Sequence, residues 1–272
     1  MELISSSQNS RIKNIQKLEI KSRERRAQNL FVIEGARELS LALSGDYEID
    51  SAFVCPKLFA KTDYPEVLMS IPEEKSFELT EAVFEKLVYR KGSDGLVTLA
   101  HPKKHSLSEL NLSDDPFIII LESVEKPGNL GAILRTADAA KADAVIICDP
   151  MTDLYNPNVI RSSIGCIFTV PVAVASNEET LAFLQQNKIT SFAAELQASQ
   201  WYHKTDFTRP SAIIMGTEAN GLTPFWLKQA DTRIKIPMRG VIDSLNVSVS
   251  TAVISFEAMR QRQFRDHPTD MF

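Results

Sequence analysis

Residues 117–123, FIIILES, constrain the fold of this chain more than any other segment. A continuous apolar run of this length is typical of a strand that is buried on both faces, and such strands belong mainly to parallel sheets covered by helices. The run is followed by the glycine-containing loop VEKPGNLG, by a helical pattern in LGAILRTADAAK, and by a second apolar strand at 142–149. This half of the chain is therefore predicted to be an α/β domain with a parallel sheet.

The remainder of this half continues the alternation of strands and helices. Further strands are predicted at 167–173, 190–194, 211–215 and 233–236, with helices between most of them. A long helix is predicted over 245–264. It carries apolar side chains on more than one face, so we expect it to be buried against the sheet or against a partner subunit.

The first hundred residues form a smaller alternating unit. Helices are predicted at 36–43 and 81–89, the second capped by Thr80, and strands are predicted at 31–35, 51–55, 75–79 and 95–100. The polar run 101–116 contains two prolines and little apolar periodicity, so it is the best candidate for a linker. The chain is thus expected to have two α/β domains.

A basic helix is predicted near the N-terminus, over residues 10–27. Residues 1–27 hold seven Lys or Arg and three Glu, whereas the whole chain has a net charge of −5. Two interpretations stay open for this helix, a solvated face or a contact for a polyanion. The overall acidity argues against binding nucleic acid through bulk charge, but it does not argue against a local basic face.

Composition excludes several other classes. No run reaches 18 apolar residues, which argues against a membrane span, and the first residues lack a secretion signal. Cys55, Cys148 and Cys166 are widely spaced, so we expect buried thiols in a reducing, cytoplasmic compartment. The four histidines have no metal-ligand spacing, and no metal is expected.

Two glycine clusters follow predicted strands. Gly128 and Gly131 lie in PGNLG, and Gly216 and Gly221 lie in MGTEANG. Glycine turns at the carboxyl ends of parallel strands let the backbone approach a ligand, so a ligand site is expected at this edge of the sheet. Neither cluster matches a dinucleotide or P-loop pattern, and ordinary tight turns remain the alternative.

A third loop, MRGVIDSLNVSVS, precedes the last helix, where Ser244 or Asn246 could act as its cap. The three loops together contain five candidate side chains. They lack a general base with a pKa near 7, a metal cluster and a nucleophile–histidine pair. The set suits the orientation of a hydroxyl or phosphate better than covalent catalysis. Its members are Asn129, Arg135, Glu218, Ser244 and Asn246.

These loops carry a family resemblance. EKPGNLGAILRTADAA resembles motif 1 of the SpoU (TrmH-type) RNA ribose 2′-O-methyltransferases of the SPOUT superfamily, IIMGTEANGL resembles motif 2, and IKIPMRGVIDSLNVSVSTAVISFEAMRQR resembles motif 3. NLFVIEGARELSLAL resembles an L30e-like substrate-binding domain. The resemblance implies an L30e-like domain over 1–107, a linker over 108–115 and a methyltransferase domain over 116–272.

The resemblance implies a trefoil-knotted α/β fold, an exception to the rule that chains are not knotted. It also implies a homodimer with the last helix in the interface and each site completed across it. The expected cofactor is S-adenosylmethionine, held by backbone groups and apolar side chains. By motif matching, its pocket contains Met215, Gly216, Ile236, Met238, Leu245 and Asn246.

The resemblance makes Arg135 the catalytic arginine, with Asn129 and Glu218 orienting it and the ribose. Ser244 and Asn246 would hold the substrate and the loop. A guanidinium is very hard to deprotonate, so we expect Arg135 to stabilise the developing oxyanion of a ribose 2′-hydroxyl rather than to act as a base.

The predicted activity is methyl transfer to a ribose 2′-hydroxyl of RNA. The L30e-like domain favours ribosomal RNA, by analogy, over transfer RNA. Two rival functions stay open, a non-catalytic knotted protein that binds RNA or assists ribosome assembly, and a knotted methyltransferase that acts on guanine. Trp201 and His203 are expected either to stack on a base or merely to pack within their loop.

Overall fold

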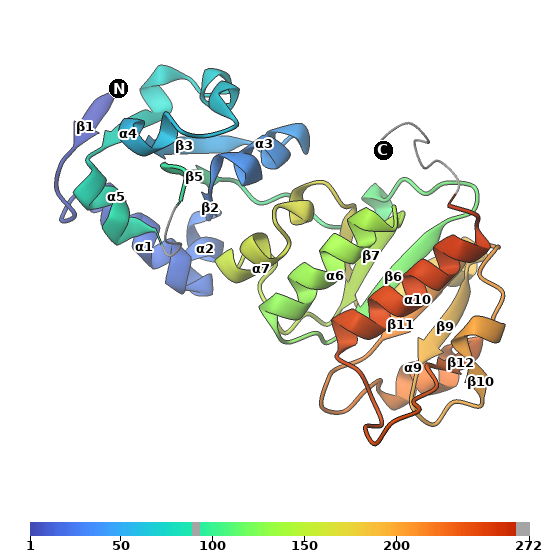
Figure 1. Cartoon of the computed structure of the whole chain (residues 1–272). Helices are drawn as coiled ribbons and strands as arrows, with labels where there is room; N and C mark the ends of the chain where they lie inside the picture. The colour runs from blue at the N-terminus through green and yellow to red at the C-terminus, as the bar shows by residue number, and fades with distance from the viewer. Residues whose placement is uncertain (89–92, 265–272) are drawn as a thin grey trace. The chain divides into compact units, whose positions relative to one another are not determined.

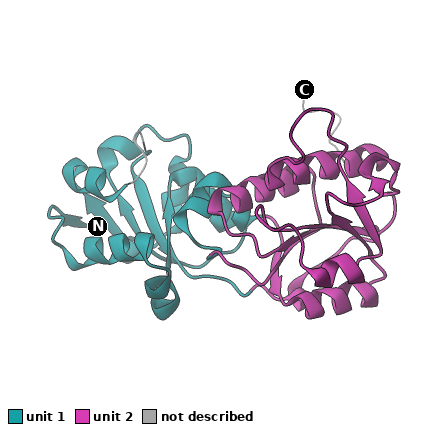
Figure 2. Cartoon of the chain, turned by 90° about the horizontal axis from the view of Figure 1, so that it is seen from below, with its two compact units in different colours: residues 1–104, 153–169 teal, residues 105–152, 170–272 magenta. Residues whose placement is uncertain are grey.

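Two β-sheets organise the chain in the computed structural model, which describes residues 1–88 and 93–264 (Figure 1). Each sheet forms the centre of one compact unit. Unit 1 contains residues 1–104 and 153–169, and unit 2 contains residues 105–152 and 170–272, of which 265–272 are not described (Figure 2).

The sheet of unit 2 confirms the predicted parallel α/β architecture. Its seven strands lie in the order β10-β12-β9-β11-β6-β7-β8, and every neighbouring pair is parallel. The strands are β6 (Phe117–Glu122), β7 (Ala144–Cys148), β8 (Val172–Ala175), β9 (Thr190–Ala194), β10 (Gln200–Trp201), β11 (Ser211–Met215) and β12 (Thr232–Lys235).

Helices cover both faces of this sheet. Helices α6 (Pro127–Ala139) and α10 (Val247–Gln261) lie side by side on one face (Figure 1). On the other face, Ile118 and Ile120 of β6 join a buried cluster with Leu184 of α8 (Asn177–Gln186) and Trp226 of α9 (Pro224–Gln229). Successive strand residues point to opposite faces, so a strand covered in this way is apolar at almost every position.

Unit 1 has a mixed five-stranded sheet in the order β1-β4-β3-β5-β2. The strands are β1 (Glu2–Ile4), β2 (Phe31–Glu34), β3 (Ile49–Val54), β4 (Ser76–Leu79) and β5 (Leu96–Ala100). Phe53 packs in a cluster with α1 (Ser10–Ile20) and α5 (Glu81–Leu87), whereas Val54 packs in another with α3 (Ala36–Ser44). The remaining helices of unit 1 are α2 (Ser22–Gln28), α4 (Pro56–Phe59) and α7 (Pro157–Ser162), with 3-10 turns at Pro65–Ser70, Glu73–Lys75 and Cys166–Phe168.

The predicted helix over 10–27 is two helices, because Lys21 is extended, with φ −110° and ψ 108°. Arg25 explains why the break is stable. Its guanidinium donates to the carbonyl oxygens of Leu18 and Glu19, which the end of α1 leaves without helical partners, and it forms an ion pair with Asp153. The basic segment therefore bends around a buried arginine.

Three other local predictions need correction. The strand expected at 167–173 begins at Val172, because Gly165, with φ +86°, starts a 3-10 turn before it. Thr80 precedes α5, but its side chain makes no capping hydrogen bond. The helix predicted over 81–89 ends at Leu87, and its last predicted residue, Tyr89, lies outside the described residues.

The segment 153–169 follows β7 in the chain but belongs to unit 1. The predicted domain bounds place it with the methyltransferase domain, so the compact units differ from them here. An aromatic cluster accounts for the difference: Tyr155 stacks on Phe31 at 4.3 Å between ring centroids, and Phe168 contacts the ring of Tyr47 at 5.0 Å. The predicted linker 108–115 lies in unit 2, and its first two residues belong to the 3-10 turn Leu107–Glu109.

Cys55, Cys148 and Cys166 are all buried and form no disulfide with one another, as expected. Burial raises the pKa of the Cys148 thiol to about 12. Within residues 1–88 and 93–264, no helix has the length and apolar character needed to cross a membrane.

Glu19 should make the stability of the protein depend on pH. Burial, together with the negative charge of Glu34, raises its pKa to about 7, although Arg161 opposes this shift. The native state therefore loses stability as the pH rises from about 4.5 to 7, because the unfolded chain ionises first. We expect Glu19→Gln to raise the melting temperature at pH 8 and to leave it nearly unchanged at pH 4.5.

Glu179→Gln is a control that should change the melting temperature at pH 8 in the opposite direction. Hydrogen bonds with Ser176 lower the pKa of Glu179, so this substitution should lower the melting temperature at pH 8. A Glu19→Gln variant whose melting temperature relative to the parent is the same at both pH values would contradict the prediction.

Candidate functional site

A cavity of about 600 Å³ lies at the carboxyl ends of β9, β11 and β12. Its walls come from four stretches of unit 2, at 194–197, 215–222, 234–238 and 244–254, and from Leu227. The parallel direction of the strands brings these stretches together, because the residues after each strand emerge at the same edge of the sheet. Eight of the ten predicted site residues line the cavity, namely Met215, Gly216, Glu218, Ile236, Met238, Ser244, Leu245 and Asn246.

The loop after β11 has a shape that only glycine permits at two positions. A Cβ on Gly216 would lie 2.2 Å from the carbonyl carbon of Gly221, and Gly221 has φ +65°. Thr217 and Gly221 exchange two backbone hydrogen bonds of 3.0 Å, which close the loop. The loop therefore folds back on itself and presents its backbone to the cavity.

The start of α10 contributes another part of the cavity wall. Asn246 is the N-cap of this helix, and its side-chain oxygen accepts from the backbone N–H of Ser248 at 2.9 Å. Its side-chain amide donates to Oδ1 of Asn129 at 3.3 Å, which joins the third loop to the first. Capping and a role in the site are thus compatible functions of one side chain.

Asn129 lies in the first turn of α6, half-buried. Its Nδ2 is buried and has no hydrogen-bond partner among the described residues. A buried amide donor without an acceptor is costly, and it is a ready partner for an oxygen atom of a ligand.

Glu218 forms an ion pair with Lys126, the residue that precedes α6. The two side chains also border a smaller hollow of about 150 Å³ beside the main cavity. In the part of the chain that the structure describes, no hydrogen bond or ion pair joins Glu218 to Arg135, so the orienting contact expected between them is not present in this state.

Arg135 lies in α6 with an exposed side chain and does not line the cavity. Its spacing of six residues from Asn129 turns the two side chains about 120° apart around the helix axis. The structure thus brings Asn129, Glu218, Ser244 and Asn246 to one place, but within a single chain it leaves Arg135 outside that group.

Sequence reasoning missed several polar residues at the cavity. Glu195 and Gln197 follow β9, and Lys235 ends β12. The Glu195 carboxylate lies 3.8 Å from Arg233. A signal for Glu195 and Gln197 was present in the sequence, because polar residues directly after a strand also identified the other loops. Neither residue belongs to a quoted motif, whereas Lys235 lies within motif 3.

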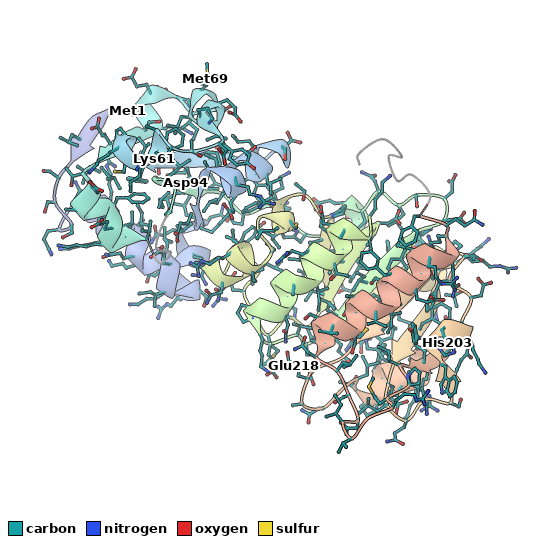
Figure 3. All side chains as sticks on the ribbon, in the orientation of Figure 1. Met1, Lys61, Met69, Asp94, His203 and Glu218 are labelled. Carbon is teal, nitrogen blue, oxygen red and sulfur yellow. The ribbon has the colours of Figure 1, made fainter. Side chains whose placement is uncertain are left out.

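The loop of Trp201 and His203 lies elsewhere. In Figure 3, His203 and Glu218 are on different sides of unit 2, and neither aromatic residue lines the cavity. The rings of Trp201 and His203 are 5.4 Å apart, and the Lys204 ammonium lies 5.0 Å from the Trp201 ring centroid. The two aromatic side chains therefore contact their own loop.

The residues that line this cavity are suited to bind a ligand and to orient it. Its volume lies in the range of small-molecule sites, and its lining mixes apolar side chains with backbone groups and a few polar side chains. Within residues 1–88 and 93–264, no cluster of His, Cys, Asp and Glu is suited to hold a metal ion.

Two family profiles match the chain. The profile of the SpoU rRNA Methylase family matches residues 116–256, and that of an MRM3-like substrate binding domain matches residues 9–98. The first covers the loops that line the cavity and also the loop of Asn129.

Individual proteins are similar over the same region or more. The 23S rRNA (guanosine-2'-O-)-methyltransferase RlmB of Pseudomonas putida is 41% identical over 151 residues, which are 55% of this chain and 61% of that protein. The chain thus matches about three fifths of the length of that relative.

Two solved structures cover nearly the whole chain. A crystal structure of an RNA 2'-O ribose methyltransferase is 39% identical, covers 96% of this chain and 99% of its own, and has a TM-score of 0.83. The AdoMet-bound rRNA methyltransferase from Sinorhizobium meliloti is 26% identical. It covers 95% of this chain and 97% of its own, and has a TM-score of 0.85.

Gly216→Ala should disrupt the loop after β11. The added methyl group would overlap the backbone at Gly221, so we expect a loss of about 1–3 kcal/mol in the free energy of unfolding. Gly128→Ala is the matched control, because no atom from outside its own turn of α6 lies within 4 Å of its Cβ position among the described residues. Alanine should be neutral there, or stabilising by up to about 1 kcal/mol. Urea unfolding measures both, and equal effects would contradict the prediction.

Proposed function

Because the chain belongs to the SpoU rRNA Methylase family, we propose that it transfers a methyl group from S-adenosylmethionine to a ribose 2′-hydroxyl of ribosomal RNA. One observation carries the proposal: the loops of motifs 2 and 3 line one cavity, and a hydrogen bond between Asn246 and Asn129 joins the loop of motif 1 to them, all within the family match. Homologues with this activity support it, among them the RlmB enzyme of Pseudomonas putida, which by name acts on 23S rRNA.

The lining of the cavity fits the proposed cofactor. Apolar groups of Met215, Ile236 and Leu245 can cover a purine ring, and the backbone of the loop after β11 supplies amide groups and carbonyls. The buried Nδ2 of Asn129 offers a hydrogen bond to an oxygen atom of the cofactor or the ribose. S-adenosylmethionine supplies an electrophilic methyl group on a sulfonium sulfur.

The residues of the chain position the 2′-hydroxyl and stabilise its charge. Methyl transfer needs the hydroxyl oxygen in line with the methyl group at about 3 Å, so much of the rate comes from orientation. In this proposal Asn129, Ser244 and Asn246 hold the ribose, and Arg135 provides a fixed positive charge to the developing oxyanion or to the adjacent phosphate. The proton leaves to a phosphate or to water, since a guanidinium is a poor base.

A homodimer is part of the proposal. Arg135 lies outside the cavity of its own chain, but α6 packs beside α10. Val249 and Phe256 of α10 are 47% and 41% exposed, although they are large and apolar. Pairing of two copies through α10 would cover this surface and let Arg135 of one copy approach the cavity of the other.

The trefoil knot and a cytoplasmic location complete the proposal. The resemblance assigns the knot to the loops of motifs 2 and 3, and the segments 216–222 and 236–246 both contribute to the cavity wall. Reduced, buried cysteines suit a reducing compartment.

Unit 1 supplies the proposed contact with RNA. It contains the match to a substrate binding domain, and exposed basic side chains lie along α1 and α2. Lys13, Lys17, Lys21, Arg23 and Arg26 are not neutralised by any ion pair among the described residues. Such a surface binds phosphates without reading sequence, and specificity is left to RNA shape.

Arg135→Ala tests the chemical step. We expect it to reduce methyl transfer at least about a hundredfold, as the loss of an oxyanion donor does. The affinity for S-adenosylmethionine, measured by calorimetry, should change little, because Arg135 does not line the cavity. Retained turnover in this variant would exclude Arg135 from the reaction.

Lys13→Gln with Lys17→Gln tests the basic surface. The affinity for transcribed 23S rRNA should fall, and the negative slope of log affinity against log salt should become less steep by about 1.5, from two lost phosphate contacts. Lys188→Gln with Lys228→Gln removes two exposed lysines of unit 2 that lie outside this surface. An equal loss in both double variants would argue against a specific contact.

Mapping of 2′-O-methyl positions in total RNA, with and without the gene, tests the function as a whole. The proposal expects the loss of a methyl group from a ribosomal RNA ribose. Loss from transfer RNA or from a guanine base would identify a different substrate. No change, together with no binding of S-adenosylmethionine, would favour a non-catalytic RNA-binding protein.

A further inference from the structure

We propose that Glu122 is a positioning residue for the loop after β11, which it holds in the shape that forms the cofactor side of the cavity. This inference rests on the proposed function for the identity of the ligand. Glu122 does not line the cavity, so its action passes through Thr223, the residue that ends the loop.

The contacts of Glu122 are short and numerous for a buried carboxylate. It is the last residue of β6, and 1% of its surface is exposed. Its Oε2 accepts from the backbone N–H of Thr223 at 2.7 Å, and its Oε1 accepts from the Thr223 hydroxyl at 2.6 Å. Hydrogen bonds to an ionised acceptor are among the strongest in proteins, so the two residues are firmly joined across 101 positions of sequence.

A second group of contacts fixes the carboxylate itself. Asn177, at the start of α8, donates to Oε1 of Glu122 at 2.9 Å. The indole N–H of Trp226 donates to Oδ1 of Asn177 at 2.6 Å, and this contact sets which side of the amide faces Glu122. Because Trp226 is fully buried, the network is anchored in the core beneath the sheet.

The loop between β11 and Thr223 has little freedom once Thr223 is held. It begins at Gly216, which is in close contact with Gly221, and the Thr217–Gly221 bridge closes it. Leu222, adjacent to Thr223, is 6% exposed and belongs to the same core cluster as Trp226. Release of Thr223 would therefore loosen the segment whose backbone forms the cavity wall.

Both oxygens of the Glu122 side chain act as acceptors in this arrangement. Oε1 accepts from the Asn177 amide and the Thr223 hydroxyl, and Oε2 accepts from the Thr223 backbone N–H, a set that suits a side chain with two acceptor oxygens and no donor. No cation forms an ion pair with Glu122 among the described residues, so hydrogen bonds alone compensate its burial. In Glu122→Gln, a new amide donor would have to face Asn177 or Thr223.

The test compares Glu122→Gln with a matched control, Asp231→Asn. Oδ2 of Asp231 accepts from the backbone N–H and the hydroxyl of Ser191 at 2.8 and 2.7 Å, which repeats the contact of Glu122 with Thr223 at the amino end of β9. We expect hydrogen exchange of residues 216–223 to accelerate about tenfold in Glu122→Gln and to remain unchanged in Asp231→Asn. Unchanged exchange in Glu122→Gln would overturn the proposal.

Calorimetry with S-adenosylmethionine provides the functional measurement. The dissociation constant should rise about tenfold in Glu122→Gln, by loss of a preformed site, and less in Thr223→Val, which keeps the backbone donor. Parent-like affinity in Glu122→Gln would overturn the inference and leave the proposed function intact. Failure of the parent protein to bind would instead contradict the proposed function, while the exchange measurement still decides whether Glu122 positions the loop. If Glu122→Gln does not fold, Thr223→Val decides by both measurements, since parent-like exchange and affinity there would overturn the proposal.

Discussion

The common direction of the seven strands in unit 2 is the constraint on which the site depends. Strands β6 and β11 are adjacent and in register from Phe117 beside Ser211 to Leu121 beside Met215. Because they run the same way, the chain leaves both at one edge of the sheet, and β9 and β12 end there too. Burial of the sheet by helices on both faces keeps this edge as the place where backbone and polar side chains are available to a ligand.

The parts of this arrangement that follow from local physical chemistry could be predicted from the sequence. The apolar run at 117–121 indicated a strand buried on both faces, and the glycines at 216 and 221 indicated a turn with close backbone contacts. Asn246 had the chemistry of an N-cap and is one. By contrast, α1 ends where the Arg25 guanidinium donates hydrogen bonds to the carbonyl oxygens of its last turn. The sequence of α1 itself contains no pattern that indicates this ending.

Pairings between distant residues could not be predicted. Lys126 and Glu218 are 92 positions apart, and each follows a strand as an ordinary polar residue. The same holds for Glu122, which reads as the polar end of an apolar strand until its partner Thr223 is known. Strand direction indicates which loops meet at one edge of the sheet. Which side chains of those loops form ion pairs or hydrogen bonds depends on the length of each side chain and on how far each loop extends beyond the end of its strand.

Residues 153–169 belong to unit 1 although unit 2 precedes and follows them in the chain, and this affects how the protein can be cut into separate domains. The chain passes between the two units at three places, near residues 104, 152 and 169, rather than once through a linker. Exchange of the substrate-binding unit with that of a relative would therefore require three junctions. A single cut after residue 107 would leave Phe31 and Tyr47 without Tyr155 and Phe168, and would present an aromatic surface to water. We therefore expect natural recombination to transmit the two units together, as one interlaced block.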